Sequence, residues 1–131
     1  MAKDALLDFG SASLATKNTA VNSANELKLD VANGDIANAP NICIKAYASA
    51  DFVSGDTVVA EVQVKKLSTD SYATVLTSEE VAMKKGIPLV IPFPHITSDY
   101  GFMQMKYTPK STGTFTAVSV SAEIDVGGTT A

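Results

Sequence analysis

Residues 57–66 read TVVAEVQVKK, and this stretch decides the fold class of the chain. Every second residue from Val58 to Val64 is apolar, whereas Glu61 and Lys65 stand on alternate positions. Alternation with a period of two predicts a β-strand with one buried and one solvated face. Branched side chains at this density are typical of an antiparallel sheet that has one side in water.

Two further strands are predicted upstream of this stretch. They are ELKLDV at 26–31 and ICIKAYA at 42–48, which alternate in the same way. Residues 32–41 between them are rich in Asn, Asp, Gly and Pro, so we expect a loop there.

Four strands and a shorter element are predicted downstream. The strands are expected at 72–77, 87–91, 100–108 and 115–125, with a short strand or single turn at 81–83. Pro88 and Pro92 bracket one strand, which favours an edge position or a bulge because proline donates no ladder hydrogen bond. The turn residues at 109–113 predict a hairpin loop.

These elements predict an all-β chain: a single-domain antiparallel β-sandwich of about eight strands at roughly 8–12-residue spacing. The small polar residues near the start predict an extended N-terminal arm at 1–20, with an irregular strand as the alternative. The sandwich domain is expected at 21–128 and a frayed tail at 129–131.

The charge composition excludes some partners. The 131 residues carry a net charge of −4, and all ten basic residues are lysine. Phosphate contacts and guanine recognition both depend strongly on arginine, so we expect no nucleic-acid partner. The longest apolar run is far too short to span a bilayer, and the start lacks the features of a signal peptide. We therefore expect no membrane partner and synthesis in the cytoplasm without export.

No motif in the chain predicts catalysis or metal binding. Cys43 is the single cysteine, so an internal disulfide or a cysteine-based zinc site is excluded, and a buried structural thiol is favoured. His95 is the single histidine, and we favour a loop residue over a general base because no nucleophile motif accompanies it. Glu79 and Glu80 are interpreted as solvated loop charge. We therefore predict no enzyme activity, no cofactor and no metal.

The first ten residues contain an apolar group that needs burial. Leu6, Leu7 and Phe9 either close one end of the sandwich or dock on a neighbouring chain, and the sequence leaves both alternatives open. Met103 and Met105 are interpreted as core filling, with an adaptable partner contact as the alternative.

The order of these segments resembles the small jelly-roll capsid decoration (cement) proteins of tailed bacteriophages. The similarity extends from about residue 20 to 128 and is clearest in KGIPLVIPFP at 85–94, YGFMQMKYT at 100–108 and AEIDVGG at 122–128. The resemblance implies a β jelly roll without enzyme activity. It also implies a virion protein on the outer capsid surface, where it binds the major capsid protein of a phage head and stabilises contacts between its subunits.

The resemblance further implies a homo-oligomer, with a dimer favoured and a trimer possible. Arg and Trp, the usual interface hot spots, are absent, so aromatic and aliphatic side chains are the expected anchors. The candidate interface residues are Leu6, Leu7, Phe9, Phe93, His95, Tyr100 and Tyr107. The alternatives are a jelly-roll carbohydrate-binding module and a head or tail completion protein. The first is disfavoured by the lack of Trp and of a calcium loop, and the second differs in copy number.

Overall fold

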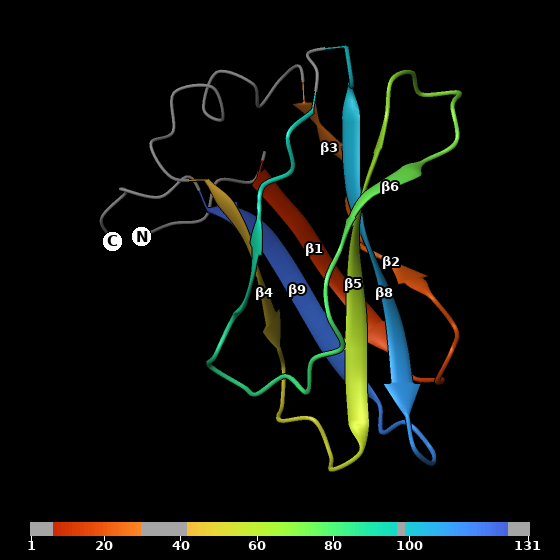
Figure 1. Cartoon of the computed structure of the whole chain (residues 1–131), viewed down its shortest axis with the longest axis vertical. Helices are drawn as coiled ribbons and strands as arrows, with labels where there is room; N and C mark the ends of the chain where they lie inside the picture. The colour runs from red at the N-terminus through yellow and green to blue at the C-terminus, as the bar shows by residue number, and fades with distance from the viewer. Residues whose placement is uncertain (1–6, 30–41, 97–98, 126–131) are drawn as a thin grey trace.

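The computed structural model describes residues 7–29, 42–96 and 99–125 (Figure 1). Strands in this part of the chain form two antiparallel sheets packed face to face, which confirms the predicted β-sandwich. Leu6, the predicted loop at 32–41 and the predicted tail at 129–131 lie outside the described residues.

The two sheets interleave along the chain. The first has the order β1-β9-β4-β7, with β1 Asp8–Leu14, β9 Val118–Asp125, β4 Cys43–Ala48 and β7 Leu89–Pro92. The second has the order β2-β8-β5-β6, with β2 Val21–Asn22, β8 Phe102–Ser111, β5 Asp56–Lys65 and β6 Ala73–Thr77, and β3 Leu27–Lys28 also pairs with β8. In Figure 1, β1, β9 and β4 lie behind β5 and β8.

The strand pairs are nested. β1 pairs with β9. The short strands β2 and β3 both pair with the same side of β8, and this is the next pair inward. β4 then pairs with β7, and β5 pairs with β6. A chain that doubles back in this way and wraps into two sheets is a jelly roll, the type that the sequence resemblance implied.

Period-two patterning places the inward side chains as predicted. Val58, Ala60, Val62 and Val64 of β5 are all buried, and so are alternate residues of β4 and β9. Met103 and Met105 of β8 are fully buried, which confirms their interpretation as core residues. An edge-to-face ring pair between Phe52 and Phe115, with centroids 5.7 Å apart, packs against this core where β4 leads into β5 and β8 into β9.

The prediction of an extended arm at 1–20 is wrong for residues 8–14, where the alternative, an irregular strand, is found: they form β1 at the edge of the first sheet. Pairing with β9 fixes this segment, because Phe9, Ala12 and Leu14 then point into the core. Gly10, at a positive φ of 76°, lies where the register shifts by one residue. The small polar side chains between these positions hid the alternation from sequence reasoning.

The predicted hairpin loop at 109–113 is also wrong. β8 continues through Pro109 to Ser111, and the chain then crosses to the first sheet to form β9. Val58, opposite Pro109, exchanges its backbone hydrogen bonds with Val81 on its other side. Val58 and Pro109 therefore form a non-hydrogen-bonded pair, in which the missing proline N–H costs the β5–β8 ladder nothing.

The sandwich is closed along one side. Ser23 N–H donates to Met105 O at 2.8 Å, which holds the segment between β2 and β3 on the second sheet. Asn25 N–H donates to Phe9 O at 2.8 Å, and Ala24 N–H donates to Ser11 O, so the same segment also covers the outer edge of β1. At the other side, the edges belong to β7 and β6.

Candidate protein interface

Three residues predicted for an interface lie in the core of the chain itself. Leu7 is 5% exposed, and Phe9 and Tyr107 are 0% exposed. For Leu7 and Phe9, the structure thus realises the first of the two alternatives: they pack inside the sandwich. Intramolecular packing accounts for their apolar character without a partner.

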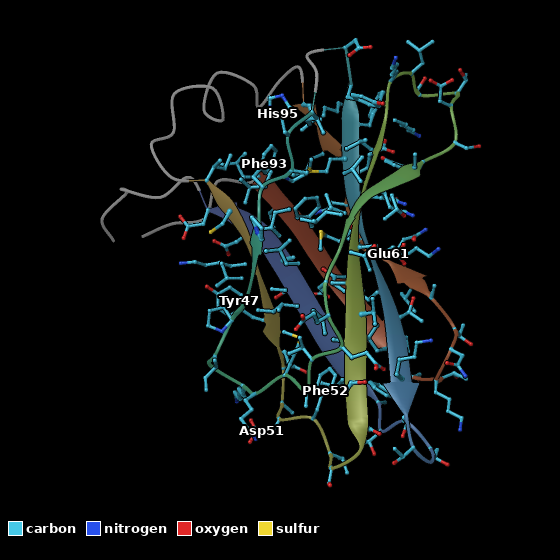
Figure 2. The ribbon with its side chains drawn as sticks, viewed as in Figure 1. Tyr47, Asp51, Phe52, Glu61, Phe93 and His95 are labelled. Atoms are coloured by element: carbon cyan, nitrogen blue, oxygen red, sulfur yellow. The ribbon has the colours of Figure 1, made fainter. Side chains whose placement is uncertain are left out.

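Phe93, His95 and Tyr100 lie on the connection from β7 to β8. Phe93 and Tyr100 are half-buried against the core, whereas His95 is exposed. Figure 2 shows Phe93 and His95 towards the same end of the sandwich, opposite Asp51 and Phe52. Among the selected residues that the structure describes, these three retain substantial accessible surface.

Tyr100 is held in place from the end of β5. Lys66 Nζ lies 2.9 Å from Asp99 Oδ2 and 5.4 Å from the Tyr100 ring centroid. The hydrogen bond to the Asp99 carboxylate raises the pKa of Lys66. Because both side chains are about half exposed, water screens this pair and its contribution to stability is small.

The exposed large apolar side chains differ from the predicted set. In the described part of the chain they are Val53, Leu67, Val75, Ile87 and Val90, and each side chain is 40–65% exposed. Val75 lies on β6, Val90 on β7, and Ile87 just before β7. The sequence signal that could have identified two of them was the edge position predicted from Pro88 and Pro92.

A shallow groove of about 330 Å³ lies beside β7. Its lining comes from residues 81–84 and 87–90 and is apolar apart from Lys84. Ile87 and Val90 both line it and are both exposed. The groove thus joins the exposed apolar side chains of this edge into one surface.

A polar network crosses the outer face of the second sheet. Gln104 Nε2 donates to Gln63 Oε1 at 2.8 Å, and Gln63 Nε2 donates to Thr74 Oγ1 at 3.1 Å. Thr74 Oγ1 donates in turn to Glu61 Oε1 at 2.9 Å. The network links β8, β5 and β6, and therefore fixes β6 to the sheet by side chains as well as by its backbone. In Figure 2, Glu61 and Tyr47 lie on opposite sides of the sandwich.

A second cluster joins the two margins of the same sheet. The Tyr72 hydroxyl, just before β6, donates to the Glu26 carboxylate, just before β3. Lys65 Nζ lies 3.2 Å from Glu26 Oε2 and sits over the Tyr72 and Phe102 rings, at 4.6 and 5.3 Å from their centroids. The hydrogen bond from Tyr72 lowers the pKa of Glu26, whereas burial raises the pKa of Tyr72.

An ion pair lies on the outer face of the first sheet. Lys45 Nζ lies 2.7 Å from Asp125 Oδ2, and hydrogen bonding to this carboxylate raises the pKa of Lys45. Cys43 is partly buried beside this pair, and burial raises the pKa of its thiol. A thiol with a raised pKa is poorly ionised at neutral pH and therefore a weak nucleophile.

Within residues 7–29, 42–96 and 99–125, no three His, Cys, Asp or Glu side chains lie close enough together to hold a metal ion. The same ranges contain no helix that is long and apolar enough to cross a membrane.

Comparisons with known proteins give a distant structural likeness. No protein-family model matches the chain, and no curated protein matches it. One similar solved structure is that of infectious bursal disease virus, Gt strain. The match covers 89% of this chain and 29% of the viral chain, with 12% sequence identity and a TM-score of 0.49. The match with the structure of the Gx strain covers 95% of this chain and 32% of the viral chain, with 12% sequence identity and a TM-score of 0.46. The chain thus spans about a third of the length of either of these chains.

Proposed function

We propose that this chain is a virion structural protein that decorates the outer surface of a phage head and stabilises contacts between major capsid protein subunits. The structural observation that supports the proposal is the nested pairing of β1 with β9 through to β5 with β6. This pairing matches the jelly roll that the sequence resemblance to phage decoration proteins implied. Jelly rolls also serve lectins and cupins, so the resemblance, rather than the fold, selects the virion role.

The surface suits binding to a protein shell without catalysis. On the outer face of the first sheet, Ser11 lies opposite Ser121 and Ser13 opposite Ser119, so that part of the face carries only short side chains. The exposed apolar side chains lie on edges and loops rather than in a deep pocket. Flat faces with exposed edges are suited to contacts with another protein, whereas small-molecule sites are usually concave.

Stabilisation by such a protein would come from repetition. A weak contact made by many copies on a lattice sums to a large free energy, and an oligomer that binds two or more capsid subunits gains further through effective concentration. We propose a homo-oligomer, a dimer or a trimer, for this reason. Phe93, His95 and Tyr100 are the proposed contact residues that remain accessible.

The experiment combines copy number with binding. Quantitative mass spectrometry of virions from the phage that encodes the chain should give hundreds of copies per particle. Purified chain added to expanded heads that lack it should bind saturably, compete with unlabelled chain, and raise the temperature at which the heads disrupt.

Two results would contradict the proposal. Absence of the chain from purified virions, together with no saturable binding to heads, would exclude a decoration protein. Tens of copies or fewer, confined to one vertex, would identify a head or tail completion protein instead.

A further inference from the structure

Three of the four sheet margins are protected against pairing with another strand. The edge of β1 is covered by the backbone bonds from Ala24 and Asn25. β2 and β3 are two residues long each, and β7 is four residues long with Pro88 before it and Pro92 at its end. Coverage, short length and proline are among the devices by which natural sheets prevent edge-to-edge pairing.

β6 is five residues long, one more than β7; in the described part of the chain its outer edge is not covered, and its only irregularity there is the register shift at Val75. Its sequence, ATVLT, contains neither proline nor charge, and four of its five residues are exposed. In the described part of the chain, β6 pairs only with β5. Ser78 N–H donates to Ala60 O, so the preceding residue, Thr77, directs its own N–H and C=O away from β5. β6 thus offers unpaired backbone groups at the margin of the second sheet (green in Figure 1).

β6 is also held in the sheet by side-chain contacts. Thr74 is bonded to both Gln63 and Glu61 of β5, and Leu76 packs against the core. Val75 lies at the register shift between β5 and β6 and is 40% exposed. A strand that is ordered before binding loses little conformational entropy when a partner pairs with it.

Acidic side chains stand both before and after β6. Asp70 lies before the strand, where its carboxylate accepts the Leu67 N–H and interacts electrostatically with Lys66. Glu79 and Glu80 follow the strand, and Glu80 accepts a hydrogen bond from Thr57 Oγ1; all three carboxylates are exposed. In an antiparallel pairing of two copies, the end of one β6 would meet the beginning of the other. Glu79 and Glu80 would then face a second Asp70, and repulsion between like charges opposes such a dimer.

We propose that the β6 edge binds an extended segment of a partner protein that has lysine or arginine on both sides of a short apolar core. The segment would add a strand next to β6 by backbone hydrogen bonds, and its cations would face the acidic residues at both ends. This inference rests on the proposed function, under which the segment belongs to the major capsid protein.

The inference is tested first without any phage head. Two seven-residue peptides, Lys-Val-Thr-Val-Thr-Val-Lys and Glu-Val-Thr-Val-Thr-Val-Glu, are titrated into the isotopically labelled chain and followed by amide NMR. We expect shifts concentrated at Ala73–Thr77 with the lysine peptide, weaker at higher salt, and at least tenfold weaker binding of the glutamate peptide. Shifts at Leu89–Pro92 instead, no shifts at β6 at millimolar peptide, or equal binding of both peptides would overturn the inference.

A matched pair of variants then connects the edge to heads. Val75→Lys and Val90→Lys both place a charge at an exposed valine on an edge strand, one on β6 and one on β7. We expect Val75→Lys to weaken peptide and head binding at least tenfold, and Val90→Lys to change each less than twofold. Equal losses of binding in the two variants would refute the inference. Self-association of the wild-type chain in sedimentation that Val75→Lys abolishes would also refute it, because β6 would then pair with a second copy. Peptide binding without any head binding would leave the edge assignment standing and overturn only the proposed function.

Discussion

The carboxylate of Asp56 accepts a hydrogen bond of 2.6 Å from Ser111 Oγ, which joins the first residue of β5 to the last residue of β8. Its second oxygen accepts the N–H of Thr116 at 2.9 Å, on the crossing from β8 to β9. Asp56 is only 3% exposed. One buried carboxylate therefore fixes the place where the chain passes from the second sheet to the first.

Replacement of Asp56 by alanine should destabilise the fold. It leaves the Thr116 N–H without an acceptor in a partly buried site, which costs about 1–3 kcal/mol of unfolding free energy. Asp56→Asn should cost less, because its oxygen can still accept from Thr116 while its amide donates to Ser111. Urea unfolding measures both, with Glu79→Gln as the exposed control. Equal midpoints for Asp56→Ala and wild type would show that this contact does not stabilise the fold.

Replacement of Tyr107 by phenylalanine should leave stability unchanged or raise it by about 1 kcal/mol. The Tyr107 hydroxyl is buried and has no hydrogen-bond partner among the described residues, so its desolvation is uncompensated. Burial also raises the pKa of Tyr107, so wild-type stability should fall as pH rises above 10, and the variant should lose less. Urea midpoints at neutral and alkaline pH test this, with Tyr47→Phe as control. A loss of more than 1 kcal/mol would contradict it.

The contact between Glu26 and Tyr72 should stabilise the sandwich except in acid. The lowered pKa of Glu26 means that its contribution is present above the ordinary value of 4.5 and is lost as pH falls below it. Glu26→Gln should therefore lower the urea midpoint at pH 7, and the difference from wild type should shrink in acid. Glu79→Gln is the matched exposed control. A difference that stays constant with pH would rule out this ionisation as the cause.

Gly101 should not tolerate a side chain. A Cβ there would lie 2.8 Å from the backbone oxygen of Lys66, and Gly101 N–H already bonds to Lys65 O. Gly101→Ala should cost about 1–3 kcal/mol through overpacking at the beginning of β8. Gly113→Ala, where a Cβ meets nothing within 4 Å, should be neutral or slightly stabilising. Thermal unfolding that ranks the two variants in the opposite order would disprove this assignment.

Strands with strong alternation could be predicted from sequence, together with the faces that they bury. In β5, period-two patterning alone selected Val58 and Val62 as core residues. β1 could not be predicted in this way, because Ser11 and Ser13 are typical of polar loops and only pairing with Ser121 and Ser119 gives them a strand position. The continuation of β8 through Pro109 could likewise not be predicted, because it depends on which backbone groups of β8 face β5.

The interface residues were harder to predict, because large apolar side chains mark a core and a binding surface equally. Phe9 and Tyr107 were selected for size and proved to be buried, whereas Val75 was passed over and is exposed. Exposure at an edge depends on which strands are left without a neighbour, and that is a property of topology. No local sequence pattern around Val75 indicates that its strand lies at an edge.

The nesting of the strands has a consequence for how the chain reaches its native state. Leu14 pairs with Val118, so the outermost ladder joins segments that are about a hundred residues apart. Folding slows as native contacts become more distant in sequence, and this topology belongs to the slow end of that range. β1 also has no partner strand until β9 has left the ribosome, so Phe9 and Leu14 remain open to aggregation or chaperones during much of synthesis. Slow maturation should thus limit the yield of this protein more than its final stability does.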